Sequence, residues 1–175
     1  MIIFKEVATL EIGACGANGA MGAVLTDYKD KLGEGGLNFE GQLPQPIDEK
    51  LDGSDVPLVS IAGPRSGHYV TGTLKKFTVD DIAVFEGGTV TTGVYSAPTT
   101  RQTIYKSVKI TGKDVGGEYT ELNMPKCAVM GMRFGNPNSD AAGIYGLAFG
   151  IKEILPVDAS GDPLPPHTIE SKASA

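Results

Sequence analysis

Glycine and proline interrupt this chain so often that no long regular helix fits between them. Its 175 residues include 24 glycines and 11 prolines, and both counts exceed average usage. Glycine favours turns and proline ends helices, so the apolar runs between them stay short. The chain is long enough to bury one sizeable core. This pattern predicts an all-β domain built from many short strands.

Apolar and polar residues alternate in several of these runs, as in half-buried strands. Pro125 interrupts one run at a place where a strand start, edge or bulge tolerates proline. Two runs flank the turn GPRSG and predict a hairpin. With no βαβ rhythm, six to eight strands predict an antiparallel β-sandwich or barrel. The runs that predict strands are 4–12, 37–42, 58–62, 67–75, 102–111, 117–134 and 142–155.

One segment, TVDDIAVFEG at residues 78–87, carries a helix signal. Thr78 is a suitable N-cap, and Asp80 and Asp81 follow in the first turn, where the helix dipole favours acidic side chains. Gly87 is suited to end the helix. We therefore expect one short α-helix, about two turns long, that flanks the sheet.

Two segments are rich in proline and polar residues. Residues 43–57 (LPQPIDEKLDGSDVP) predict a long exposed loop, and a loop of that length is usually functional or disordered. Residues 156–175 predict a flexible C-terminal tail. The expected organisation is one β domain over residues 1–155 followed by this proline-rich tail.

Charge and cysteine content disfavour several classes of function. The net charge of −6 disfavours a protein that grips nucleic acid by its phosphates, although a duplex can slide past a surface that repels it. Cys15 and Cys127 are too few for a metal cluster or a disulfide framework, and their pairing stays open. The start MIIFKEVATL lacks the long apolar run of a secretory signal, and no run approaches the roughly 18 apolar residues of a membrane helix. We expect a protein that is made in a cytoplasm and enters no membrane.

The segment GACGANGAMG at residues 13–22 raises the question of a phosphate site, because it follows a predicted strand. A dinucleotide-binding loop has the spacing GxGxxG before a long helix, and a P-loop ends in GK[ST]. Here a glycine stands at every third residue, and no long amphipathic helix follows. We interpret the segment as a loop of small residues that lets another backbone approach closely.

No set of side chains predicts a reaction. His68 and His167 are the only histidines and lie far apart in the chain, whereas a zinc site takes three or four ligands at short spacings. Ser66 lacks the GxSxG context of an activated serine. The paired acidic residues fit a helix start and a solvated loop better than an acid–base pair. We therefore expect no enzyme activity, no cofactor and no metal.

From residue 58 to 154 the order of features resembles that of phage tail tube proteins. The segment TVDDIAVFEGG corresponds to the short helix beside their β-sandwich or barrel. A strand with the centre LNMPKCAV, a turn SDAAG and a final apolar strand look like their closing meander. The segment GANGAMG looks like the turn after their first strand. Segment 43–57 and the proline-rich tail depart from the pattern.

The resemblance implies a structural virion protein of the phage tail, made in the host cytoplasm. In that family six copies form a ring, and the rings stack into a hollow tube. Double-stranded DNA passes through the lumen without specific binding, and sheath, baseplate or terminator proteins are further partners. An acidic lumen would keep DNA from sticking, which the net charge of −6 fits.

We expect subunit contacts in two segments of the chain. The side chains of the glycine-rich loop 13–22 are small enough for a neighbouring subunit to approach closely. The loop 43–57 is a candidate arm that reaches another subunit. The candidate interface residues are Gly13, Cys15, Gly16, Gly19, Gly22, Pro44, Pro46, Asp48, Glu49 and Asp52.

Two alternatives remain open from the sequence. A capsid decoration protein or a tail terminator would have a similar sequence pattern. Both differ from a tube protein, whose rings stack without end. A small ligand-binding β-barrel would need a pocket with converging polar groups, and no cluster in the sequence predicts one.

Overall fold

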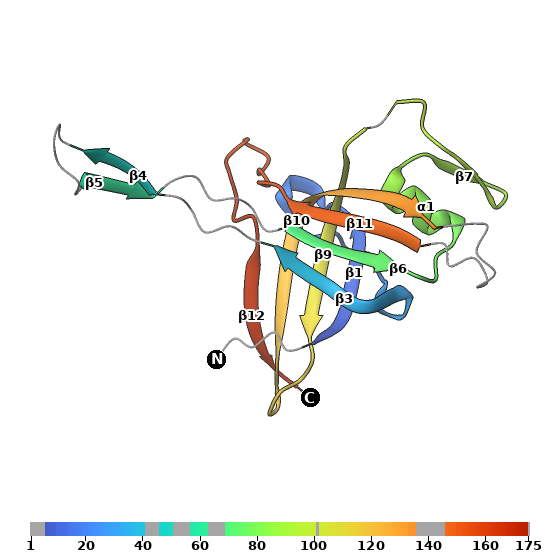
Figure 1. The fold of residues 1–175 in the computed structure, drawn as a ribbon, viewed down its shortest axis with the longest axis horizontal. Coiled ribbons are helices and arrows are strands. Elements are labelled where there is room, and N and C mark those ends of the chain that lie inside the picture. Colours follow the sequence, from blue (N-terminus) through green and yellow to red (C-terminus); the bar gives the residue numbers. More distant parts are fainter. Residues whose placement is uncertain are drawn as a thin grey trace.

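The alternating runs form strands, and these strands build one curled antiparallel sheet (Figure 1). The computed structural model describes residues 6–40, 46–50, 57–62, 69–100, 102–135 and 146–174. The elements are β1 (Val7–Ala14), η1 (Ala17–Gly19), β2 (Leu25–Asp27), η2 (Lys29–Lys31), β3 (Leu32–Glu40), β4 (Pro46–Lys50), β5 (Pro57–Ala62), β6 (Tyr69–Leu74), α1 (Val79–Glu86), β7 (Thr89–Thr91), β8 (Val94–Ser96), β9 (Ile104–Gly112), β10 (Glu118–Phe134), β11 (Gly146–Glu153) and β12 (Thr168–Ala173). The prediction of an all-β fold with one short α-helix is thus confirmed for the described residues.

The main sheet has the order β2-β1-β9-β10-β11-β6-β3, and β12 also pairs with β10. Its pairing is non-local, since Val7 of β1 lies opposite Gly112 of β9. The edge strands β2 and β3 are joined only by the short segment 28–31, so the sheet must curl until these edges approach each other. Residues of β1 and β3 line a shallow depression between them, and no β1–β3 pairing occurs in the described chain. The curled sheet therefore stays open along this line.

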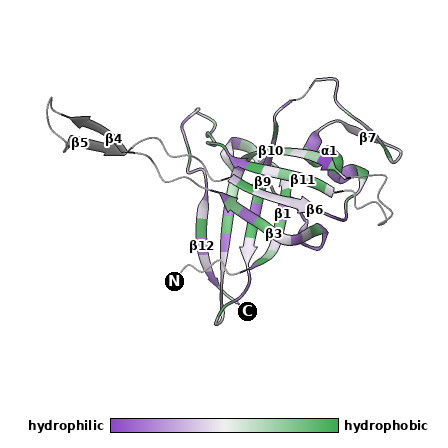
Figure 2. Cartoon of the chain, in the orientation of Figure 1, coloured by the Kyte–Doolittle hydropathy of each residue, from purple (hydrophilic) through white to green (hydrophobic). Residues whose placement is uncertain are grey.

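The core lies inside the curl. Alternation on β9 buries Val108 and Ile110 fully, and alternation on β11 does the same for Leu147 and Ile151. Figure 2 shows hydrophobic and hydrophilic residues alternating along the strands. Because most of the apolar area lies on this inner face, burial of these side chains is the main stabilising contribution to the fold.

Strand β10 continues through Pro125, and of the strand start, edge or bulge that the sequence left open, the structure has a bulge. Pro125 lies between Met124 and Cys127, where the pairing with β9 shifts register. Before this bulge β10 pairs with β12, and after it β10 pairs with β11. A bulge accommodates the missing proline N–H and increases the local twist, so one 17-residue strand serves two sets of neighbours.

The flexible tail expected after residue 155 is not observed, because residues 168–173 form β12 and join the same sheet. Strand β12 pairs antiparallel with β10. The segment before it is held by a bridge between Val157 and Pro163, and by contact of His167 Nδ1 with the buried carboxylate of Glu153. Polar composition misled the prediction, since backbone pairing at a sheet edge can hold a strand whose side chains are mostly exposed.

Acidification is expected to loosen β12. Glu121 of β10 lies opposite Glu170 of β12. Burial disfavours its ionised carboxyl, but hydrogen bonds from Lys172 and Asn123 outweigh this and lower the pKa of Glu121 below its usual 4.5. A group with a lowered folded pKa stabilises the folded state above its unfolded pKa and loses this effect as pH falls through the folded value.

Hydrogen-exchange protection of the β12 amides should therefore fall as pH drops below about 4.5. Glu121→Gln should lower protection at neutral pH and remove most of this step. An equally large step in the variant would show that another group controls the pairing.

The loop predicted over residues 43–57 is partly strand instead. Strand β4 pairs antiparallel with β5, and Figure 1 shows this β4–β5 hairpin standing clear of the main sheet. The hairpin expected between 58–62 and 67–75 is wrong as well, because β6 pairs with β3 and β11. Each strand of the β4–β5 hairpin is an edge strand, and edges tolerate proline and charge.

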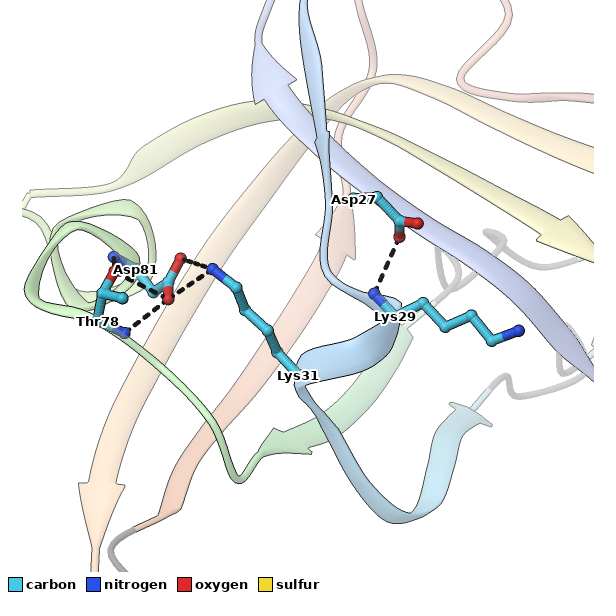
Figure 3. Close-up of polar contacts among 5 residues, drawn as sticks. All are labelled: Asp27, Lys29, Lys31, Thr78 and Asp81. Carbon is cyan, nitrogen blue, oxygen red and sulfur yellow. Dashed lines mark hydrogen bonds and ion pairs between the residues drawn. The ribbon is translucent and has the colours of Figure 1, made fainter.

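Helix α1 begins and packs as its sequence predicts. Thr78 and Asp81 form a reciprocal capping box, and Asp81 also accepts two hydrogen bonds from Lys31 Nζ at 2.7 and 2.8 Å (Figure 3). Burial, together with the nearby carboxylates of Asp81 and Asp80, raises the pKa of Tyr28 to about 12. Phe85 enters the core, so the helix covers one end of the curled sheet.

Candidate assembly surface

The glycine-rich segment folds back on its own strand. A side chain on Gly22 would overlap the carbonyl oxygen of Ala14, and one on Gly13 would overlap that of Val24. The amide of Gly22 donates to Ser107 Oγ at 3.0 Å. These two glycines are therefore required by close backbone approach within one chain.

The rest of the segment contacts the C-terminal part of the same chain. Gly19 has φ of +73° and would meet Val157 O and Leu164 with any side chain. The amides of Gly16 and Ala20 donate to carbonyl oxygens within the loop. These donors already have partners, so they do not form a phosphate cradle, and the small residues serve internal packing.

Both cysteines are free thiols. Cys15 is half-buried in the glycine-rich segment, and burial raises the pKa of its thiol. Cys127 is fully buried in the core, and burial raises its pKa strongly. Neither thiol is therefore a ready thiolate nucleophile.

The other predicted contact residues fall on or beside the β4–β5 hairpin. Pro46, Asp48 and Glu49 belong to β4, while Pro44 and Asp52 lie outside the described residues. The structure thus separates the two predicted segments: the glycine-rich loop packs on its own chain, and the β4–β5 hairpin stands clear of the sheet (Figure 1).

A further candidate surface, which the sequence analysis did not single out, lies on the outside of the sheet. Met130, Met132 and Phe134 of β10 are 49%, 61% and 46% exposed. They alternate with Val129 and Gly131, which face the core and α1. A run of exposed large apolar side chains on one face is typical of a protein–protein contact site. In the sequence, the run VMGMRF places apolar residues on both faces of a strand. This pattern could have indicated that one apolar face is exposed.

The neighbouring strands give this face a shallow trough. Opposite Met130 and Met132 lie Gly150 and Ala148 of β11, and beyond these lie Thr71 and Thr73 of β6. The Tyr69 side chain lies over Gly150, so the low floor is at Ala148, between Met132 and Thr73. We call this surface, over β6, β10 and β11, the outer sheet face.

A row of cations and rings borders the outer sheet face. Strand register aligns Tyr69, Lys152, Ala128 and Tyr105 across four neighbouring strands. Lys126 Nζ lies 4.9 Å from the centre of the Tyr105 ring. Neither Lys126 nor Lys152 has a carboxylate partner within the described residues. Lys152 thus lies within this row and Lys126 lies beside its Tyr105 end, while Glu40 of β3 stands at the other end, opposite Tyr69.

Two long sheet edges are also unpaired on one side in the described chain. Strand β3 pairs only with β6, and β12 pairs only with β10. Backbone N–H and C=O groups on such edges can accept a strand from another molecule. The curled sheet thus offers both an apolar face and open edges for assembly.

Other kinds of site are less well supported in the described residues. They contain no group of three histidine, cysteine or acidic residues placed to hold a metal, and none of their helices has the length and apolarity to cross a membrane. No protein-family model matches this chain, and a search of curated proteins gives no significant match.

Proposed function

We propose that this protein is a structural subunit of a phage tail tube, in which copies of the chain form rings that stack around a DNA-conducting lumen. The observation that carries the proposal is the outer sheet face, where three large apolar side chains are about half exposed beside open strand edges. Exposure of these side chains to water does not stabilise a monomer, whereas a neighbouring subunit would bury them.

Three further features support assembly over catalysis or ligand binding. The resemblance of segment 58–154 to tail tube proteins concerns the helix and the strands around it, of which α1, β9, β10 and β11 are described, while the turn SDAAG lies outside the described residues. The net charge of −6 suits a tube through which DNA slides without binding. The depressions found in the described surface are open to solvent, whereas a small-molecule site encloses most of its ligand.

Negative-stain electron microscopy of the purified protein over a concentration series tests the proposal. Hollow filaments of stacked rings are the expected result. Single rings that never stack would favour a tail terminator. A chain that sediments as a monomer at every concentration, with or without preformed tubes as seeds, would contradict the proposal.

A further inference from the structure

We propose that Met130 and Met132 of β10 form an oxidation site, at which hydrogen peroxide or another two-electron oxidant makes methionine sulfoxides that stop copies of the chain from associating. The formation of the sulfoxides depends on the exposure of the two thioethers. Their effect on association rests on the proposed function, because it requires that the outer sheet face is buried between subunits.

Exposure separates these two methionines from the others in the described residues. Met130 and Met132 are 49% and 61% exposed, whereas Met124 of the same strand is fully buried in the core. Met21 in the glycine-rich segment is half-buried. Because a peroxide must reach the sulfur, oxidation should favour Met130 and Met132 over Met21, and it should reach Met124 last.

The sheet leaves both thioethers uncovered. The described pairing of β10 with β9 ends before Met130, so no residue of β9 pairs with either methionine. On the other side, Ala148 of β11 lies opposite Met132 and carries only a methyl group. Gly150 lies opposite Met130, but the Tyr69 side chain lies over this glycine. Met132 should therefore be oxidised before Met130.

Each oxidation is a two-electron step. A lone pair of the sulfur attacks one peroxide oxygen and the O–O bond breaks. The proton of the transferred oxygen passes to the departing oxygen, which leaves as water, so the sulfur is oxidised and the peroxide is reduced. The product is a polar sulfoxide. On a free subunit this group stays in water, whereas between subunits it would lose its hydrogen bonds to water, and association would weaken.

The cysteines are the competing oxidisable groups. Cys127 is fully buried. Burial raises the pKa of the half-buried Cys15 thiol, which lowers the fraction of thiolate that reacts with peroxide. A variant that keeps both thiols but lacks Met130 and Met132 therefore identifies the residues responsible for any loss of association.

Mild peroxide treatment of the full chain tests the inference. Mass spectrometry of proteolytic peptides should find sulfoxide first at Met132 and then at Met130. The treated protein should need at least about a tenfold higher concentration to assemble, with an unchanged melting temperature. Methionine sulfoxide reductases, which act on sulfoxides and not on oxidised cysteine, should restore assembly. Sedimentation velocity with negative-stain microscopy measures assembly.

Matched variants separate this effect from damage elsewhere in the chain. Met130→Leu with Met132→Leu keeps the volume and the apolar character, so it should assemble within about threefold of wild type both before and after peroxide. Met130→Gln with Met132→Gln places polar side chains of similar length on the same face, and should assemble as poorly as the oxidised wild type. Met21→Leu should behave as the wild type does in both states.

Each outcome decides one question. Restoration by the reductases, together with a resistant leucine variant, supports the inference. Wild-type assembly that is unchanged although both methionines are oxidised overturns the inference and leaves the proposed function standing. A leucine variant that loses assembly as the wild type does, or sulfoxide that forms first at Met21 or Met124, also overturns it. A wild-type chain that never self-associates overturns both proposals.

Discussion

Replacing Phe85 with alanine is expected to lower the free energy of unfolding by about 3–5 kcal/mol. The Phe85 side chain is fully buried. Its ring centre lies 5.0 Å from that of Phe149 and 5.5 Å from that of Tyr28, the latter pair edge to face. Gly131 of β10 leaves the space into which Phe85 fits. Truncation would leave a cavity between α1 and the sheet.

Chemical denaturation followed by tyrosine fluorescence or circular dichroism would measure this loss. Phe85→Leu, which keeps most of the volume, should cost about 1–2 kcal/mol. Phe134→Ala is the exposed control and should cost about 1 kcal/mol or less, while weakening assembly. A Phe85→Ala loss as small as that of Phe134→Ala would mean that the helix does not anchor the core.

Asp81→Ala is expected to cost about 3 kcal/mol. The Asp81 side chain is 5% exposed, and its carboxylate joins two elements far apart in the chain. It pairs with Lys31 from η2 and accepts hydrogen bonds from the amide and hydroxyl of Thr78. Removal loses the helix cap and leaves a half-buried ammonium without its partner. The effect stays at the low end for a buried pair because Lys31 is 29% exposed and can regain water.

A double-mutant cycle with Lys31→Met isolates the ion pair from the cap. Lys31→Met should cost less in the Asp81→Ala background than in the wild type, since its partner is already absent. Asp81→Asn, which keeps an acceptor for Thr78, should lose about half as much stability as Asp81→Ala. Strictly additive costs would show that Lys31 and Asp81 do not interact.

Local signals in the sequence predict the helix and the strands of this fold better than they predict which strands pair with each other. The helix prediction is correct because Thr78 and Asp81 interact within the first turn and Gly87 ends the last turn, so each signal is local. An irregularity at Pro125 is predictable because proline lacks an N–H wherever it stands, but the sequence left open whether this was a strand start, an edge or a bulge. Alternation also predicts β9 and β11 as strands, since side chains on a strand have a period of two.

Pairing and exposure depend on residues far away, and there the predictions fail. Strand β12 is polar and short, and only the free edge of β10 beside it makes it a strand. Strand β5 was expected to pair with β6, which instead lies between β3 and β11. The glycines at Gly13 and Gly22 do permit close approach, but the approaching backbone is that of Ala14 and Val24. The outer sheet face is visible only once β6, β10 and β11 are aligned.

The distance along the chain between β1 and β9 has a consequence during synthesis. β1 can pair early with β2, but its longer pairing with β9 has to wait until the residues through Gly112 have been made. At about 5–20 residues per second, the wait is roughly 5–20 s. During this time the edge of β1 that later pairs with β9, and the apolar side chains of β1, can contact other nascent chains. A protein needed in many copies would thus depend on chaperones, or on slow aggregation of its nascent chains, early in its life. Raising its expression rate should increase the insoluble fraction before it increases the yield of folded subunits.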